Sequence, residues 1–325
     1  MNILILSCGT RSLLVDYFMD RKNGFDRVVT TDCSVYSPAL YRADKYYIVP
    51  RMEEPGYLPL IMEICRNEDI NAVLPLQENE LVLIAENSSL FLNERILPII
   101  SNADLVNLCR DKLSFYNCMF DEGIPVVTTY TIEQANEAVQ KHGLPLFMKP
   151  RFGAGSVSSH VINYEAEIQS IVRNENEDFI LQPYIEGTEY GINAYVDFVS
   201  GKLTELFVLK KIRMRAGETE KSVSIHNEPI TKIVKQVCNT LAFRGPIDID
   251  ILEKDGNYFI MEINPRFGGA YPHTHNCGVN FIKLLAKNSS GKENPRFRMD
   301  YEAGIVALRY MTILMMKESD LQNEK

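Results

Sequence analysis

The chain has 325 residues, of which 46% are hydrophobic and 24% are charged, and its formal net charge is −9. This length allows two or three structural units with a sizeable core, and the composition is that of a globular protein rather than a disordered one. The negative charge disfavours a nucleic-acid partner, and seven cysteines without a C-x-x-C pair favour reduced thiols in a cytoplasm.

The first hundred residues alternate between short apolar runs and amphipathic stretches. We expect strands at 3–7, 27–31, 72–76 and 95–99. We expect helices at 13–21, 58–67 and 78–87. The alternation predicts a parallel sheet covered by helices. No cationic stretch precedes the first apolar run, so we interpret it as a buried strand and not as a signal peptide.

The turn after the first strand is Gly9-Thr10-Arg11-Ser12, which lacks the G-x-G-x-x-G spacing of dinucleotide-binding folds. Asp32 follows the second strand, where such folds carry a ribose-binding acid, but without the glycines a nicotinamide-dependent oxidoreductase is disfavoured. The segment 74–78 places polar groups at the carboxyl end of a strand, where open α/β sheets bind ligands.

A second unit begins near residue 101. A helix is expected over 103–123, a capped helix from Thr131, and a strand over 144–150 that ends in Lys149. The glycine- and serine-rich loop 151–159 follows. A cation at a strand end, followed by small residues with free N–H groups, can hold a phosphate. A flexible connector has the same composition and remains an alternative.

Strands are expected at 179–184, 190–197 and 202–211. The first ends at Pro183, which leaves backbone groups free to bond a planar heterocycle, and Gln182 adds an amide; a ligand-free crossover is the alternative. Four cations in the run 210–215 suit the capture of a phosphate or carboxylate, although a solvated basic turn is also common.

The most informative segment is a predicted hairpin around the turn 254–257. Glu262 and Asn264 are two residues apart, so on a strand they point the same way, and Asp250 lies on the partner strand. Arg266 adds a fixed cation just beyond. Few protein oxygens, with the remaining ligands from phosphates and water, suit Mg²⁺ on a nucleotide triphosphate.

The rest of the chain adds little chemistry. Helices are expected at 232–241 and 281–287, and a linker at 291–295. The pair His273-x-His275 has no third ligand at suitable spacing, and Pro272 favours a loop, so a zinc site is disfavoured. The apolar run 305–316 is too short to span a bilayer.

Taken in chain order, these features resemble the ATP-grasp superfamily, and they look most like the branch of the carbamoyl-phosphate synthetase large subunit and biotin carboxylase. The resemblance covers roughly residues 1–290. Its elements are Lys112, Lys149, the loop 153–159, the segment 182–187, Glu189, Asp250 and the run 262–266. The fold it implies is α/β, with an N-terminal parallel-sheet lobe (1–101), a two-lobed α+β ATP-grasp domain (102–290; lid 112–185, large part 186–290) and a C-terminal extension (291–325).

The resemblance also implies roles for individual residues. The contacts to ATP would come from Lys112, Lys149, Gly153, Gly155, Ser156, Gln182, Tyr184, Ile185 and Glu189. Mg²⁺, with Mn²⁺ as an alternative, would be held by Asp250, Glu262 and Asn264. Arg266 would stabilise the reacting phosphoryl centre, and Lys211 or Arg215 would meet the acyl phosphate or the substrate carboxylate. Asp250 departs from the Glu or Gln that is more common in the family.

The implied activity is that of a cytoplasmic ATP-dependent ligase that joins a small carboxylate to an amine (or thiol) through an acyl phosphate. Two alternatives remain open: a carboxylating or carbamoyl-phosphate-forming component that works with a partner chain, and a non-catalytic nucleotide-binding module. No nucleic-acid or membrane partner is expected, and pairing of two chains through the N-terminal lobe stays open.

Overall fold

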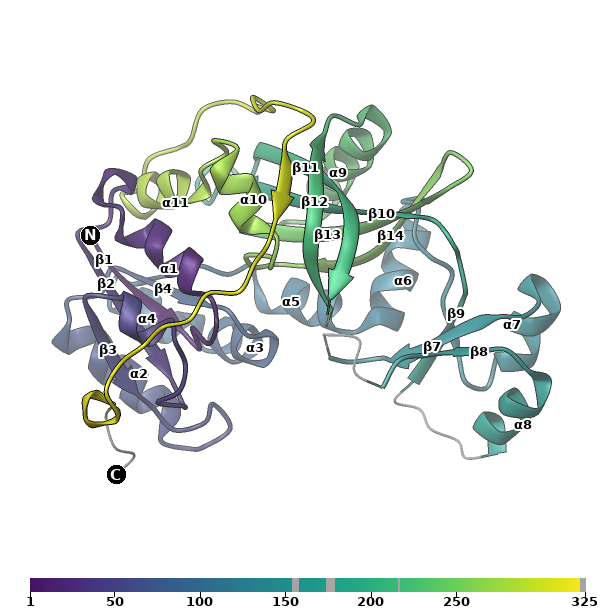
Figure 1. The fold of residues 1–325 in the computed structure, drawn as a ribbon, viewed down its shortest axis with the longest axis horizontal. Helices are drawn as coiled ribbons and strands as arrows, with labels where there is room; N and C mark the ends of the chain where they lie inside the picture. The colour runs from purple at the N-terminus through teal and green to yellow at the C-terminus, as the bar shows by residue number, and fades with distance from the viewer. Residues whose placement is uncertain (154–157, 174–178, 216, 322–325) are drawn as a thin grey trace.

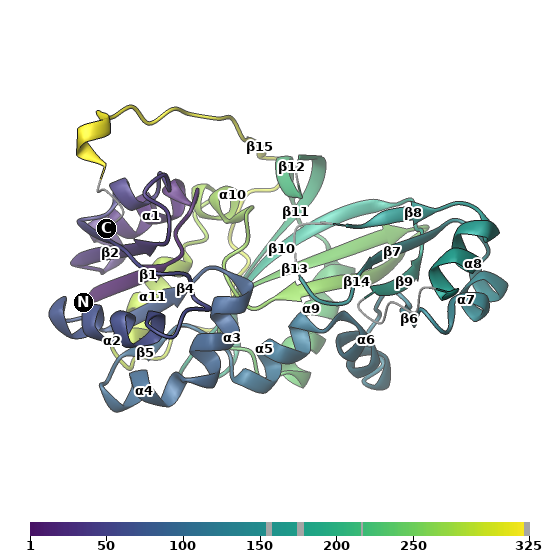
Figure 2. The same cartoon turned by 90° about the horizontal axis from the view of Figure 1, so that it is seen from below.

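The structure is a computed structural model that describes residues 1–153, 158–173, 179–215 and 217–321. In this described part no helix has the length and apolar character needed to cross a membrane. The molecule is elongated, with a parallel-sheet lobe at one end and a small antiparallel lobe at the other (Figure 1). A large antiparallel sheet lies between the two (Figure 2).

The N-terminal lobe is built on a five-stranded parallel sheet of order β3-β2-β1-β4-β5. Its strands are β1 (Asn2–Leu6), β2 (Arg27–Asp32), β3 (Lys45–Ile48), β4 (Ala72–Pro75) and β5 (Leu97–Pro98). Its helices are α1 (Ser12–Met19), α2 (Tyr57–Asn67), α3 (Glu78–Glu86) and α4 (Ser88–Asn93). The predicted parallel sheet is confirmed. The sequence did not predict β3, because this edge strand has only four residues and none of them is fully buried.

The central sheet has six strands in the order β14-β13-β10-β11-β12-β15, and every pairing in it is antiparallel. Its strands are β10 (Thr188–Val196), β11 (Leu203–Arg215), β12 (Glu218–Ile225), β13 (Gly245–Lys254), β14 (Asn257–Asn264) and β15 (Val306–Leu308). Helices α5 (Ala103–Arg110), α6 (Lys112–Asp121) and α9 (Glu228–Thr240) accompany this sheet.

The small lobe is a four-stranded antiparallel sheet of order β6-β9-β7-β8 with two helices on it (Figure 1). Its elements are β6 (Tyr130–Thr131), α7 (Ala135–His142), β7 (Leu146–Pro150), β8 (His160–Ile162), α8 (Glu165–Arg173) and β9 (Phe179–Pro183). Residues 160–162 pair with β7 as an edge strand, and α8 begins three residues later at Glu165.

The single helix expected over 103–123 is divided at Asp111. The backbone of Asp111 is extended, with ψ of 99°, and its carboxylate accepts hydrogen bonds from the amides of Leu113 and Ser114. Aspartate at an N-cap satisfies the free N–H groups of a new helix. α6 therefore begins at Lys112, which places this lysine at the mouth of the glycine–serine loop.

A shared apolar core holds the N-terminal lobe against the segment after β14. The buried ring of Phe267 lies 6.1 Å from Phe18 of α1 and 4.7 Å from Tyr271. Tyr271 begins α10 (Tyr271–Asn276), a short helix where Pro272 had suggested a loop, and α11 (Phe281–Ser289) follows it. Proline is tolerated in a first helical turn. Burial of a Phe side chain stabilises by about 1.5–3 kcal/mol, so this packing keeps residues 264–269 beside the turn after β1.

Candidate nucleotide and metal site

Four polar side chains form a square on one face of the hairpin β13–β14. Asp250 lies opposite Glu262, and Asp248 lies opposite Asn264. Residues two apart on a strand share a face, and directly paired residues share it across the ladder. The turn that sets this register has Asp255 and Gly256 both at positive φ, 52° and 80°, as a two-residue hairpin requires. Asp248 is not among the site residues predicted from the sequence, although its spacing from Asp250 signals the shared face.

The Lys211 side chain extends from β11 across β10 to this face, because Gly191 on β10 has no side chain in the way. A methyl group on Gly191 would lie 3.0 Å from Leu209 Cδ1 and 3.6 Å from the Lys211 side chain. Across this gap Lys211 Nζ lies 2.8 Å from Asp250 Oδ1 and 3.5 Å from Glu189 Oε2. Burial opposes the charge of Lys211, but the two carboxylates outweigh burial and raise its pKa to about 12.

The carboxylates of the square lie close enough to repel one another. Burial raises the pKa of Asp250 to about 7; Lys211 lowers it only in part, and the charges of Asp248 and Glu262 add to the rise. A further cation would relieve this repulsion. Among the described residues no three His, Cys, Asp or Glu side chains are gathered as a complete metal cage. Asp250, Glu262 and the Asn264 amide, which donates to Glu262 at 3.2 Å, nevertheless fit a hard divalent ion that takes its other ligands from phosphate and water.

Two lysines face the same carboxylates from the small-lobe side. Lys149 is buried at the end of β7, and desolvation lowers its pKa to about 8 although the charge of Glu262 opposes this shift. Lys112 Nζ donates to the carbonyl oxygen of Gly153 at 2.6 Å. Burial also lowers the pKa of Lys112, again against the charge of Glu262. Both lysines therefore lie close enough to Glu262 to interact with its charge.

Arg266 follows β14 directly and turns back toward the square. Its Nη1 donates to the carbonyl oxygen of Phe267 at 3.0 Å and lies 3.8 Å from Asp248 Oδ2. A methyl group on Gly268 would come within 2.3 Å of Asp248 Oδ1, so only glycine allows this approach. The backbone at Gly268 therefore lies against the carboxylate of Asp248, and Arg266 lies beside this carboxylate.

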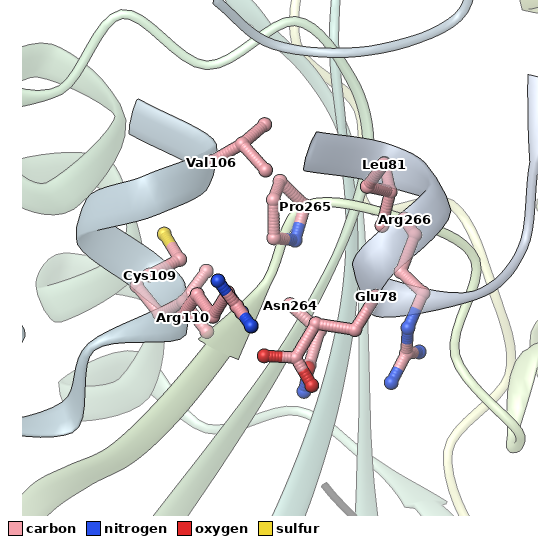
Figure 3. A pocket seen from close by; sticks show the side chains of 9 residues that line it. Glu78, Leu81, Val106, Cys109, Arg110, Asn264, Pro265 and Arg266 are labelled. Atoms are coloured by element: carbon pink, nitrogen blue, oxygen red, sulfur yellow. The ribbon is translucent and has the colours of Figure 1, made fainter. Parts of the chain in front are cut away.

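A pocket at this corner joins the N-terminal lobe to the hairpin. The Glu78 carboxylate points toward Asn264, with the guanidinium groups of Arg110 and Arg266 on either side (Figure 3). Burial raises the pKa of Glu78 although Lys112, Arg110 and Arg266 oppose the rise. The sequence analysis noted Glu78 only as a polar residue at a strand end; its position in the first turn of α3 brings it to the site.

The residues predicted to hold adenine and ribose line the strand β9 and its exit. Gln182 is buried, and its amide donates to Thr129 Oγ1 at 2.9 Å. The Tyr184 amide donates to the carbonyl of Pro145 at 3.2 Å, Ile185 is half-buried beyond it, and Glu189 lies beside Lys211.

Other predicted residues are not brought to the square. Arg215 is 63% exposed on the hairpin β11–β12 and pairs with Glu220 at 3.6 Å. Gly153 begins the glycine–serine loop with φ of 95°, whereas Gly155 and Ser156 lie outside the described residues. His273 is buried and bonds Ser222 and the carbonyl of Ile305, which is a structural role.

Comparison with known families gives two adjacent matches. Residues 3–100 match the PylC-like N-terminal domain, and residues 109–270 match the ATP-grasp domain. The arginine-specific carbamoyl phosphate synthase large chain of Geobacillus stearothermophilus is 20% identical over 311 residues, which are 91% of this chain and 29% of that relative. The chain therefore spans less than a third of the length of this curated relative.

Two solved structures have a similar fold. N5-carboxyaminoimidazole synthetase from Staphylococcus aureus, complexed with ADP, has a TM-score of 0.73 at 16% identity and covers 91% of this chain and 78% of its own. The biotin carboxylase domain dimer of Hydrogenobacter thermophilus 2-oxoglutarate carboxylase, with MgADP and bicarbonate, has a TM-score of 0.76 at 16% identity and covers 94% and 73%.

Proposed function

The chain belongs to the ATP-grasp family, in the branch of carbamoyl phosphate synthase and biotin carboxylase, and from that premise we propose that it is an ATP-dependent carboxylate–amine ligase. The observation that carries the proposal is the square of Asp248, Asp250, Glu262 and Asn264, with lysines on two sides and Arg266 beside it. Phosphoryl transfer needs this combination, because catalysis rests on positioning and on charge neutralisation.

The reaction has two steps. A carboxylate oxygen attacks the γ-phosphorus of ATP, the bond to the β–γ bridging oxygen breaks, and an acyl phosphate and ADP form. The amine then attacks the acyl carbon, phosphate leaves, and the amine loses a proton. A divalent ion on Asp250, Glu262 and Asn264 supplies charge neutralisation for the phosphates when it is bound.

The chain's own side chains divide the remaining work. Lys149 of the small lobe and Lys112 of α6 contact the phosphates, and Gln182 with the backbone of Tyr184 and Ile185 holds the adenine. Glu189 bonds the ribose. Arg266 stabilises charge at the reacting centre. Lys211 keeps Asp250 and Glu189 in place across Gly191, a positioning role that refines the direct substrate contact expected for it.

The proposal includes the domain organisation and the surroundings of the enzyme. Residues 1–101 form the N-terminal lobe, residues 102–290 form the nucleotide-binding unit, and residues 291–325 form an extension. The substrates are a small carboxylate and an amine. All seven cysteines are free thiols, which fits a reaction in the cytoplasm.

A carbamoyl-phosphate-forming component remains the second candidate, because the curated relative in Geobacillus stearothermophilus is a carbamoyl phosphate synthase large chain. Bicarbonate would then replace the organic carboxylate as the group that attacks ATP. Bicarbonate-dependent release of ADP without any organic acid would favour this candidate.

The test is a screen for ADP and phosphate release by the purified protein with Mg²⁺ and ATP, against organic acids and amines offered singly and in pairs. We expect release only with a matching pair. Glu262→Gln should abolish it, and the exposed Glu293→Gln is the matched control. Release that is unaffected by Glu262→Gln, or no binding of ATP at all, would overturn the proposal.

A further inference from the structure

Three guanidinium groups from distant parts of the chain lie close together beside the square. Arg11 comes from the turn after β1, Arg266 follows β14, and Arg309 follows β15. Two carboxylates accompany them, Asp248 of β13 and Glu218 at the start of β12. We call these five residues the arginine cluster. Its members come from both lobes and from the C-terminal extension, which pairs with β12 as the last strand of the central sheet.

Two of the three arginines already have anionic partners. Arg309 forms an ion pair with Glu218, and Arg266 lies 3.8 Å from Asp248. The Arg11 guanidinium forms no ion pair or side-chain hydrogen bond with any residue in the described part of the chain. Arg11 is partly buried, and this burial, followed by the charge of Arg266, lowers the pKa of Arg11.

The charges of the cluster do not balance. Within these five residues three cations face two anions, and Arg11 is the cation without an ion-pair partner among the described residues. A guanidinium removed from water without a partner is costly, and its planar fork matches a carboxylate. One monoanionic group would complete the cluster.

Gly269 lies between Arg11 and Glu218. A methyl group on Gly269 would lie 3.5 Å from Arg11 Nη1 and 3.6 Å from Glu218 Oε1, both ordinary contact distances. Gly269 has no positive φ, so its backbone does not require glycine. A side chain at this position would contact Arg11 and reduce the access of a ligand to its guanidinium.

We propose that Arg11, together with Arg266, binds the carboxylate of the substrate, and that this substrate is a small acid with one negative charge near the reacting centre. The inference rests on the proposed ligase function. The phosphates of ATP have their own cations, since Lys149 and Lys112 surround Glu262 from the small-lobe side. Arg309 holds Glu218 in an ion pair beside Arg11.

The test is saturation-transfer difference NMR in the presence of MgADP, with acetate, propionate and L-alanine as probes. We expect a signal for at least one probe with the wild-type protein. Arg11→Met should weaken it about tenfold or more, because a charge-assisted pair is lost. Gly269→Ala should weaken it as well, by placing a methyl group against Arg11. Arg51→Met, at an exposed arginine, should leave it unchanged.

Calorimetry with MgADP on the same variants separates this inference from the proposed function. We expect MgADP affinity within about twofold of wild type for all of them, because the lysines assigned to the phosphates, Lys112 and Lys149, lie around Glu262, and mutations at independent sites act separately. Unchanged probe signals in Arg11→Met and Gly269→Ala, with MgADP binding intact, would overturn the inference and leave the ligase proposal standing. Absence of any probe signal in the wild type would also overturn it, and absence of MgADP binding would overturn both. Arg11→Lys provides a charge-retaining variant should Arg11→Met unfold.

Discussion

Replacement of Lys211 by methionine tests whether the charge of Lys211 stabilises the carboxylates of the site. Lys211 is 6% exposed and pairs with Asp250 at 2.8 Å and with Glu189 at 3.5 Å, across the gap left by Gly191. Methionine keeps much of the side-chain length and removes the charge. The change leaves Asp250 beside Asp248 and Glu262 without its main cation.

The magnitude follows from the pKa of Lys211, which is raised from 10.5 to about 12. At about 1.36 kcal/mol per pKa unit this corresponds to roughly 2 kcal/mol of folding free energy. Because the folded pKa lies above the unfolded one, this stabilisation is complete below pH 10.5 and is lost as the pH rises through 12. Leaving a buried carboxylate unpaired typically costs about 3–5 kcal/mol. We therefore expect a loss of about 2–5 kcal/mol at pH 7.

The assay is thermal unfolding at pH 7 with EDTA present. A loss of about 2 kcal/mol lowers the melting temperature by about 4 °C or more, at about 2–4 °C per kcal/mol for domains of 150–250 residues. The matched control is Lys210→Met, since Lys210 is the neighbouring lysine on β11 and is exposed. Lys210→Met should change the melting temperature by about 1 °C or less, because it is an exposed substitution. A change that small for Lys211→Met would refute the reasoning.

Three further predictions concern other parts of the molecule. Burial raises the pKa of Glu80 to about 7 from 4.5, so the stability it contributes is complete below pH 4.5 and falls by about 3 kcal/mol as the pH rises through 7. In urea unfolding at pH 5 and pH 8, the loss of stability should be smaller by about that amount in Glu80→Gln than in wild type, and Asp250 accounts for part of the loss that remains. Gly268→Ala would push Asp248 from its place, and ADP release should drop while the far-UV circular dichroism is kept. Arg266→Met should lower turnover about 10²-fold or more, with a smaller change in MgATP affinity measured by calorimetry; an equal loss of both would contradict the role given to Arg266.

The parts of the fold that could be predicted from sequence are those with local signals. The alternation in residues 1–100 gives the parallel sheet, and the Asp255–Gly256 turn fixes the register that pairs Asp250 with Glu262. The spacing of Glu262 and Asn264 then gives the shared face directly, because side chains alternate along a strand.

The remaining features depend on contacts between distant segments. Strand β12 and the extension that pairs with it carry no clear alternating pattern, and the break at Asp111 depends on a cap within a helical stretch. The role of Gly191 depends on the tertiary structure, in which the Lys211 side chain passes over this glycine. Arg11 and Arg309 are almost 300 residues apart. They come together because Phe267 packs against the N-terminal lobe and because β15 pairs with β12, and no local pattern encodes these contacts.

Calorimetric titration of ATP into the protein, with and without Mg²⁺, tests the central claim. The claim is that the square of Asp248, Asp250, Glu262 and Asn264, together with Lys112 and Lys149, binds Mg²⁺ and the triphosphate of ATP. We predict binding that requires Mg²⁺ and is lost in Glu262→Gln but retained in Glu293→Gln. Absence of heat with Mg²⁺ present, or equal affinity in the two variants, would contradict the account.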